Sequence, residues 1–575
     1  MRMTRMALMA TLAWSAGSTA MAEDFIDGKP LSDVMDPAVQ DCRSVDPLIL
    51  PIRTTGVDTV TLFANDYQLE PNQGGEFGRN DLNVKLELEN DIRDQLEDYL
   101  SCETPIMRGT QGMLNAVADL TEGDDRTQQV AFYQHGFSNG ADAIVVRPGI
   151  NSAQDLSGKT IVIQAYGPHV SYLARILSDG KKAAQEAGQT WQEPTILYTE
   201  NLMGFGEGTP GRAFEEDDAI DAAFVTSSDA RILTSGGKVG TGAEGSVKGA
   251  RTMLSTRSAN RLISEVYVVR ADYLRNHRDQ IKNLTKALFS AEEKLRENVV
   301  KQVVDWEAVG DYLLGDPGAE DEAQQMWRDV ETVGMQGNID WATPAKPRSW
   351  KSINDEIQSG LVATGMLSSA YAMETADWNY GDFAGGVFDQ RRASLPGFDN
   401  NKASSVVASM DESGSLEKNA LMEFDINFKP NQTAFSPKQY AAKFDQVLEL
   451  AATYGGAVIT VEGHSDPLNY LKKKHNGANA STLRSIRQSA RNLSMSRAIE
   501  VRDVVLKYAE DRGQTMDESQ FVTLGHGITE PKTGMCSGDP CAPKTEAEWL
   551  SNMRVTFRIV NVEAEASTFT PINAW

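Results

Sequence analysis

Basic residues are scarce in this chain, and long apolar runs are scarcer. The 575 residues include 55 Lys and Arg against 81 Asp and Glu, which gives a net charge of −26. Because nucleic-acid recognition needs a clustered basic surface, this balance excludes nucleic acid as the partner of such a chain. Beyond the N-terminus, no run of about twenty apolar residues is present that could cross a bilayer.

Catalytic motifs are also missing. The chain has no Gly-x-Ser-x-Gly elbow, no P-loop and no His-Glu-x-x-His motif, and it has only 6 histidines that could act as general bases. We therefore predict that the protein is not an enzyme and uses no cofactor.

Cysteine occurs only 4 times, in a pattern that suits an oxidising compartment. Cys536 and Cys541 flank the short segment SGDP, and Cys42 with Cys102 could join the mature N-terminal arm to the body. Other pairings remain open on sequence alone. A metal site is the alternative, but the chain has no Cys-x-x-Cys pair and Cys42 lies far from the others. We therefore predict two disulfides and no metal site.

The N-terminus has the pattern of a secretory signal peptide at 1–22. Arg2 and Arg5 precede an apolar stretch, and small residues at 20–22 fit the cleavage positions. No cysteine lies near the cut to carry a lipid anchor. We therefore expect a mature chain that begins near Glu23 and is soluble in the periplasm.

Residues 23–395 alternate strand-like and helix-like segments, which predicts an α/β domain with largely parallel sheets. The predicted strands are 57–66, 130–137, 141–147, 159–166 and 193–199. Helical periodicity is found at 91–100, 110–120 and 169–188, and the chain after residue 270 is mostly amphipathic helix.

Three sequence segments of this region carry a family resemblance: GADAIVVRPGINSAQDLSGKTIVI at 140–163, DAAFVTSSDA at 221–230 and EVYVVRADYLRNH at 265–277. They resemble type II periplasmic solute-binding proteins of the nitrate, sulfonate and taurine class, which are related to thiamine-pyrimidine precursor proteins. The resemblance covers about 55–385. It implies two lobes, a hinge of two strands, and closure over a small-molecule solute that is passed to an inner-membrane ABC permease.

The same resemblance places the solute between the lobes. Pro168 precedes the helix at 169–188, so N–H groups of its first turn would face the cleft and could receive an anionic group. By analogy, the predicted solute contacts are Asp66, Tyr67, Thr104, Ser138, Asn139, Tyr166, Gly167, His169, Thr226 and Ser227. We expect Asp66 and Tyr67 at the end of the first strand and Thr104 in a turn that starts a helix. The alternative for each is a capping or turn residue, and for His169 a place on the helix surface.

Residues 420–562 follow the order strand, helix, strand, helix, strand, strand, and a tail occupies 563–575. The motifs FDINF, GHSD, LSMSRA and NMRV occur here in sequence. They resemble the OmpA-like peptidoglycan-binding domain. The resemblance implies a small α+β domain of βαβαββ order that holds the diaminopimelate part of the peptidoglycan stem peptide without covalent chemistry.

An acidic residue and an arginine in these motifs could hold a zwitterion. By motif position, Asp466 would bind the ammonium group and Arg497 the carboxylate, and a guanidinium offers a carboxylate two parallel donors. The resemblance implies that Phe424, Asp425 and Leu493 line the same pocket. The alternative is that Asp466 and Arg497 form only an internal salt bridge.

The surroundings of this pair carry two further predictions. Ser494 is a predicted N-cap, which would put Arg497 in the first turn of a helix, where free N–H groups favour a carboxylate. Ala490 stands where the family usually has Asn, and the gap between Asp466 and Arg497 is longer than the family's usual one. Residues 467–499 hold seven Lys or Arg and no acidic residue. This run could attract peptidoglycan carboxylates or an acidic partner, or it could be an ordinary solvated loop.

Residues 396–419 are rich in Ser, Asn, Asp and Gly and show no helical periodicity, which predicts a flexible linker. The whole pattern therefore predicts a solute-binding protein of an ABC importer, held non-covalently at the cell wall in the periplasm. The alternative is a non-transport envelope scaffold or sensor, in which the two-lobed domain binds a partner protein.

Overall fold

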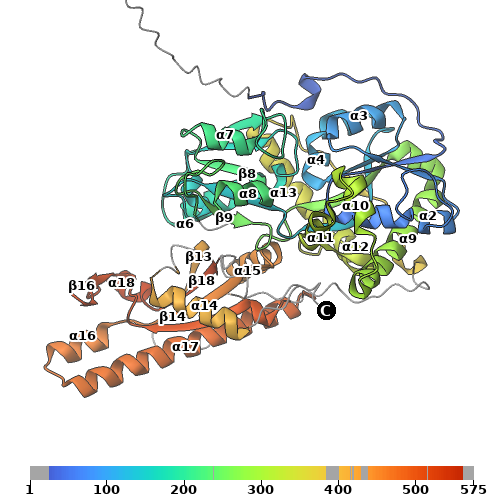
Figure 1. The fold of residues 1–575 in the computed structure, drawn as a ribbon. Helices are drawn as coiled ribbons and strands as arrows, with labels where there is room; N and C mark the ends of the chain where they lie inside the picture. The colour runs from blue at the N-terminus through green and yellow to red at the C-terminus, as the bar shows by residue number, and fades with distance from the viewer. Residues whose placement is uncertain are drawn as a thin grey trace, which may run out of the picture.

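The chain forms a two-lobed body and a C-terminal domain packed against it (Figure 1). The computed structural model describes residues 25–236, 239–383, 400–414, 416, 420–428, 438, 440–514 and 516–560. The body comprises the described residues up to 383, and the C-terminal domain those from 400. The predicted signal peptide and the predicted tail lie outside the described residues.

The first lobe contains a parallel pair, β1 with β2, and a five-stranded sheet of order β11-β4-β10-β3 in which β12 also pairs with β4. Its strands are β1 (Leu48–Ile52), β2 (Val84–Leu88), β3 (Ile106–Thr110), β4 (Gln129–Ser138), β10 (Ser264–Arg270), β11 (Val330–Thr332) and β12 (Glu374–Thr375). β10 runs antiparallel to both β3 and β4.

The second lobe is a five-stranded sheet of order β7-β6-β8-β5-β9. Its strands are β5 (Asp142–Val146), β6 (Thr160–Gln164), β7 (Thr195–Thr199), β8 (Ala222–Thr226) and β9 (Arg251–Ser255). β6 is parallel to β7 and β8, whereas β5 is antiparallel to β8 and β9. All five residues of β5 are buried because helices cover both faces of the sheet.

Helices surround both sheets. The α-helices of the body are α1 (Thr59–Ala64), α2 (Glu76–Arg79), α3 (Ile92–Ser101), α4 (Gln111–Ala116), α5 (Ala118–Thr121), α6 (Val170–Glu186), α7 (Pro210–Glu216), α8 (Ser227–Leu233), α9 (Ala271–Lys301), α10 (Trp306–Leu314), α11 (Glu320–Arg328), α12 (Gly334–Ala342) and α13 (Trp350–Thr364). Its 3-10 turns are η1 (Leu31–Asp33), η2 (Gly56–Asp58), η3 (Ala153–Leu156) and η4 (Tyr380–Asp382).

Two predictions for the body are wrong. The sheets are mixed rather than largely parallel: the chain leaves the first lobe after β4 and returns to it as β10, so these neighbours are antiparallel, and β5 is antiparallel to β8 and β9. Residues 57–66 form η2 and α1 rather than a strand. This segment is buried on nearly all sides, so its apolar residues show no single face, and such a run cannot distinguish a short helix from a strand.

Two chain segments join the lobes and form the hinge region. One is the turn at 138–142 between β4 and β5, and the other is the segment at 255–264 between β9 and β10. The lobes are therefore joined at two places, as expected, but by a turn and a strand-free segment rather than by two strands.

The C-terminal domain contains the predicted order of strands and helices as β13, α15, β14, α17, β15 and β18, with further elements before and between them. Its elements are α14 (Asn400–Glu412), β13 (Ala420–Asn427), α15 (Ala441–Thr453), β14 (Val458–His464), α16 (Leu468–His475), α17 (Ala480–Glu510), η7 (Glu518–Gln520), β15 (Phe521–Gly527), β16 (Met535–Cys536), β17 (Asp539–Pro540), α18 (Glu546–Ser551) and β18 (Arg554–Val560). The sheet order is β13-β18-β14-β15, and β14 is parallel to β15. Ile459 and Val461 pack under α15 and α17, whereas Val458 faces α14.

The flexible-linker prediction is wrong for the described part of 396–419. Residues 400–412 form α14, whose Ala403 and Val407 are buried against Val458, Val522 and Val560 of the sheet. The segment has too few apolar residues to show a periodic stripe, and the sheet supplies the apolar partner that stabilises the helix.

The predicted helix start at Ser494 is also wrong. α17 begins at Ala480, where the side chain of Asn479 accepts a hydrogen bond from Thr482 N at 2.9 Å. Ser494 is buried within the helix and accepts from Gly527 N at 2.9 Å. The extra residues of the basic segment therefore form α16 and the first half of α17, which project from the domain (Figure 1).

Both predicted disulfides are present. Cys42 pairs with Cys102, and Cys536 pairs with Cys541. Within the described ranges, no helix combines the length and hydropathy needed to span a bilayer.

Removing the Cys42–Cys102 bond should destabilise the protein more than removing Cys536–Cys541. The bonds join cysteines 60 and 5 residues apart, and the stabilisation, about 2–4 kcal/mol in typical cases, grows with loop length. Urea denaturation of the two double Cys→Ser variants measures both losses. Equal losses would show that loop closure is not the dominant contribution.

Candidate functional site

Asp142 is the centre of a polar cluster where the lobes meet. It is the first residue of β5, directly after the first crossing segment. Ser138 Oγ donates to Asp142 Oδ2 at 2.5 Å, and His169 Nε2 lies 2.7 Å from Asp142 Oδ1. Thr256, in the second crossing segment, lies 2.8 Å from Ser138 through their hydroxyl oxygens. Two predicted solute residues, Ser138 and His169, are therefore brought together at the hinge.

His169 is fully buried rather than on the helix surface. It directly precedes α6, and its Nδ1 has no hydrogen-bond partner among the described residues. The region expected to receive an anionic solute group therefore already faces a carboxylate of the protein, that of Asp142.

A buried ionic cluster extends this site into the first lobe. Arg108 of β3 contacts Asp58 at 2.9 Å and Glu265 of β10 at 2.7 Å. Arg53, just after β1, lies 4.0 Å from Glu265, and its Nε has no hydrogen-bond partner among the described residues. Burial raises the pKa of Asp58 to about 6. Because each buried charge is costly unless it is paired, these groups hold one another in place.

The second lobe contributes residues from the start of α8. The Thr226 side chain accepts from Asp229 N at 3.3 Å and donates to Asp229 Oδ2 at 2.9 Å. Asp229 also accepts from Gly204 N, and its burial raises its pKa. Thr226 therefore acts as a helix cap, the alternative considered from sequence, and Ser227 is the first residue of that helix.

Three more predicted solute residues, Tyr166, Gly167 and Asn139, contact other parts of the protein. Tyr166 has a positive φ of 55°, and its hydroxyl donates to Lys29 O at 2.7 Å, so it binds the N-terminal arm. Gly167 lies against Gln164, where a Cβ would come within 2.1 Å of the Gln164 side chain. Asn139 lies in the first crossing segment and donates from its main chain to Asp329 O.

Three predicted solute residues lie away from the lobe junction. Asp66 and Tyr67 follow α1 rather than the first strand, and burial raises the pKa of Tyr67 to about 12. Thr104 does not open a helix but lies just before the first residue of β3, whereas Thr110 is the last residue of that strand. Thr110 pairs with Glu265 at the junction, so Thr104 lies at the far edge of the sheet.

The lobes also touch outside the hinge. Arg93 of α3 forms an ion pair of 2.6 Å with Glu200, which follows β7. Gly112 of α4 lies so close to α6 that a Cβ there would come within 2.8 Å of Val170 Cγ2. The N-terminal arm pairs with Tyr198 of the second lobe through Ile26.

Asp466 and Arg497 lie at the carboxyl end of β14. Asp466 Oδ2 accepts from Leu468 N at 3.0 Å, and the side chain of Trp549 lies beside the same carboxylate. Arg497 is 1% exposed, lies 3.5 Å from His464 O, and has its guanidinium 5.4 Å from the centre of the Phe428 ring. No ion pair joins these two described side chains, so the internal salt bridge considered from sequence is not formed.

Burial disfavours the charged form of both Asp466 and Arg497. It raises the pKa of Asp466 and lowers the pKa of Arg497, so it opposes the charged form of each. Arg497 lies mid-helix, so the predicted contribution of helix-start N–H groups is lost.

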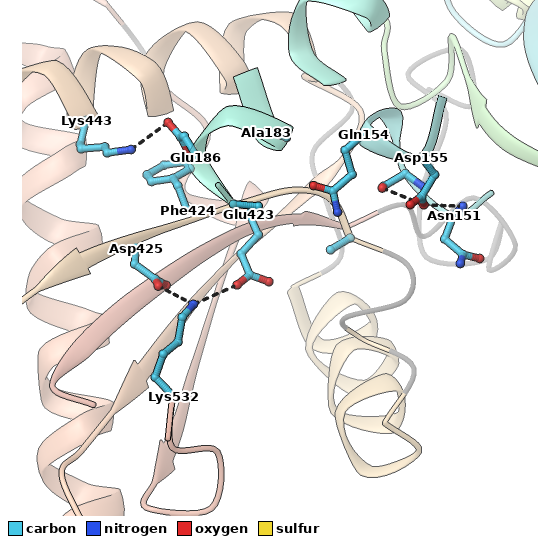
Figure 2. A pocket seen from close by; sticks show the side chains of 13 residues that line it. Asn151, Gln154, Asp155, Ala183, Glu186, Glu423, Phe424, Asp425, Lys443 and Lys532 are labelled. Atoms are coloured by element: carbon cyan, nitrogen blue, oxygen red, sulfur yellow. Dashed lines mark hydrogen bonds and ion pairs between the residues drawn. The ribbon is translucent and has the colours of Figure 1, made fainter. Parts of the chain in front are cut away.

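Phe424 and Asp425 line a different cavity, at the junction with the second lobe (Figure 2). Asp425 binds Lys532 at 2.8 Å, and Lys443 of α15 lies 5.1 Å from the Phe424 ring centre and binds Glu186 of α6. This cavity has a volume of about 660 Å³.

The strand register separates this cavity from the Asp466 pocket. Asp425 pairs with Thr556, which pairs with Glu462, so Asp466 lies roughly 13 Å further along the strand direction. The prediction of one shared pocket is therefore wrong. Leu493 is half-buried on α17, four residues before Arg497.

Sequence reasoning missed Asp142, Arg108, Asp58, Glu265 and Arg53. One usable signal was present, since Arg108 stands inside the otherwise uncharged segment IMRGT, and a charged residue in a buried strand needs a partner. Asp58 was hidden by the wrong strand assignment for 57–66.

A scan against protein-family models found no match, and a search of curated proteins found no similar sequence. Solved structures give matches at low identity. The alkanesulfonate-binding protein SsuA from Xanthomonas axonopodis pv. citri is 14% identical over 58% of this chain and 100% of its own, with a TM-score of 0.36. The periplasmic nitrate-binding protein NrtA from Synechocystis PCC 6803 is 12% identical over 58% and 93%, with a TM-score of 0.34. The desulfurization enzyme DSZB is 14% identical over 59% and 97%, with a TM-score of 0.33.

Proposed function

We propose that this protein is a periplasmic solute-binding protein that serves an ABC importer and is not an enzyme. The observation that supports this best is the buried polar cluster around Asp142, where both crossing segments and both lobes contribute side chains. Arg53 and Arg108 add two guanidinium groups on the first-lobe side of this cluster, where both lie close to Glu265. Buried groups of this kind are costly for stability, and such clusters are commonly retained where a ligand binds.

The solute should be small and polar or charged. The cluster combines two guanidinium groups with the carboxylates of Asp58, Glu265 and Asp142. Because charges of both signs are present, a fitting solute would pair with some of them and leave the others paired internally. Anions and zwitterions are both consistent with this arrangement.

We also propose that the C-terminal domain holds the protein at the peptidoglycan. Asp466 and Arg497 lie at one end of the sheet, each in a site where burial opposes its charge. The diaminopimelate side chain carries an ammonium and a carboxylate, so it complements both. Binding here would be non-covalent.

A second candidate function is an envelope scaffold or sensor whose lobes stay closed. It is favoured by contacts that brace the lobes: the Arg93–Glu200 ion pair and the arm that reaches from Ile26 to the Cys42–Cys102 bond. The C-terminal domain also touches the hinge region, since Gly456 N donates to Ser258 O at 3.1 Å. Such bracing would oppose a large opening motion.

A ligand screen distinguishes the two functions. We expect that nitrate, an alkanesulfonate, taurine, a pyrimidine or an amino acid raises the melting temperature of the mature chain in a saturable way. A ligand at a hundred times its Kd adds about 2.7 kcal/mol to the free energy of unfolding. Arg53→Gln should abolish the shift, whereas Arg79→Gln, an exposed ion-pair residue of the same lobe, should not.

Small-angle scattering completes the test. Hinge closure on a bound solute should lower the radius of gyration. If none of the five ligand classes shifts the melting temperature, the scaffold is the better description. Saturable binding with an unchanged radius of gyration would instead retain solute binding and reject hinge closure.

A further inference from the structure

Four potential metal ligands converge on the sheet of the C-terminal domain. They are Glu462, His464, His526 and Glu530, and one donor atom from each lies within 4.8 Å of the others. The cluster is separate from the cysteines, which are all paired in disulfides.

The strands explain why these side chains meet. Glu462 and His464 are two residues apart on β14, so both point to the same face of the sheet. β15 runs parallel beside it, and the register shifts where His464 pairs with Gly527. His526 is the extra residue of this bulge, and bulges commonly redirect a side chain toward a functional site. The two imidazole rings stack with centres 5.0 Å apart.

His464 provides the second, independent observation. It is 0% exposed, and neither of its ring nitrogens has a hydrogen-bond partner among the described residues. A buried imidazole without partners loses the hydrogen bonds it makes in water, which costs free energy. A metal ion bound to one ring nitrogen would remove much of this cost.

We propose that Glu462, His464, His526 and Glu530 bind one divalent transition-metal ion. Two imidazole nitrogens and two carboxylate oxygens suit Zn²⁺, and a neutral His pair with two carboxylates balances its charge. Donors around tetrahedral Zn²⁺ lie about 3.4 Å apart, so small side-chain rotations would close the site. Nothing in the peptidoglycan or solute proposal requires this ion.

The surroundings supply an outer layer of contacts and an entry path. Glu462 is held by Arg558 and by Thr460, and carboxylate ligands are commonly oriented in this way. Asp411 of α14 lies 3.7 Å from His526 Nδ1. The Glu530 side chain is 43% exposed, so an ion could enter from its side.

Metal titration of the full mature chain tests the proposal. After treatment with a chelator, calorimetry should show one Zn²⁺ per chain, and Co²⁺ should give the visible absorption of a four-coordinate ion. His464→Ala should weaken Zn²⁺ binding by more than about a hundredfold, since even outer contacts commonly contribute about 10- to 100-fold. Glu530→Gln should weaken binding as well, and its partial exposure makes misfolding a smaller risk.

His475→Ala provides the matched control, because His475 is exposed on α16 of the same domain. It should bind Zn²⁺ like the parent. Absence of Zn²⁺ and Co²⁺ binding by the parent would overturn the proposal. Unchanged affinity in a folded Glu530→Gln or His464→Ala variant would overturn it equally.

Discussion

Replacing either Asp466 or Arg497 with Ala should abolish co-sedimentation of the mature protein with purified peptidoglycan sacculi. Each change removes one half of the proposed clamp and leaves the opposing charge of the ligand without a partner. A loss of this kind is roughly 2–5 kcal/mol, which lowers affinity by tens-fold to thousands-fold. Arg497→Lys should also bind poorly, because an ammonium cannot reproduce the two donors of a guanidinium.

The controls address folding and non-specific charge. Arg497 is 1% exposed, so its variants need a melting curve, and Asp466→Asn serves as a conservative companion. Neutralising Lys472, Lys473 and Lys474 on the exposed part of α16 should weaken binding only modestly and mainly at low salt. If Asp466→Ala and Arg497→Ala pellet as well as the parent, the peptidoglycan proposal is wrong.

Replacing Arg175 with Ala should destabilise the protein by about 3–5 kcal/mol, the usual cost of breaking a buried ion pair. Arg175 of α6 is 2% exposed and binds Asp179 at 2.7 Å, Glu356 of α13 at 2.7 Å and Glu449 of α15 at 2.8 Å. It therefore joins the second lobe, α13 and the C-terminal domain. Without it, three carboxylates lose a common cation, and Asp179 is almost fully buried.

Urea denaturation measures this loss, and limited proteolysis reports whether the C-terminal domain separates first. Arg212→Ala is the matched control, since Arg212 forms an exposed pair with Glu216 on α7 that should contribute less than about 1 kcal/mol. A loss for Arg175→Ala no larger than for Arg212→Ala would show that this junction does not stabilise the assembly of the domains.

The first residue of α17 could not be predicted from residue types alone. Asn479 and Ser494 are both good N-cap residues, and the sequence favoured Ser494 because it stands in a known motif. The hydroxyl of Ser494 instead accepts a hydrogen bond from Gly527 N at the end of β15, and Gly463 packs against the Ser494 main chain. Only this long-range packing determines that the helix continues through Ser494.

α14 and the Asp142 cluster also depend on packing that the local sequence does not reveal. The segment at 400–412 has little intrinsic helical signal, and burial of Ala403 and Val407 on the sheet stabilises it as a helix. Asp142 looks like an ordinary strand start, and it becomes a site only when Ser138 and His169 converge on it. Contacts between residues far apart in the chain leave no local pattern to recognise.

The sequence by itself predicted strands β4 to β7 of the lobes, the order β13, α15, β14, α17, β15, β18 in the C-terminal domain, and the formation of two disulfides. These features depend on local hydrophobic periodicity, turn residues and cysteine spacing. The tertiary structure alone decided the mixed sheets, the separation of Asp425 from Asp466, and the meeting of His464 with His526. Strand register and sheet order set these distances, and both arise from packing between segments that are distant in the chain.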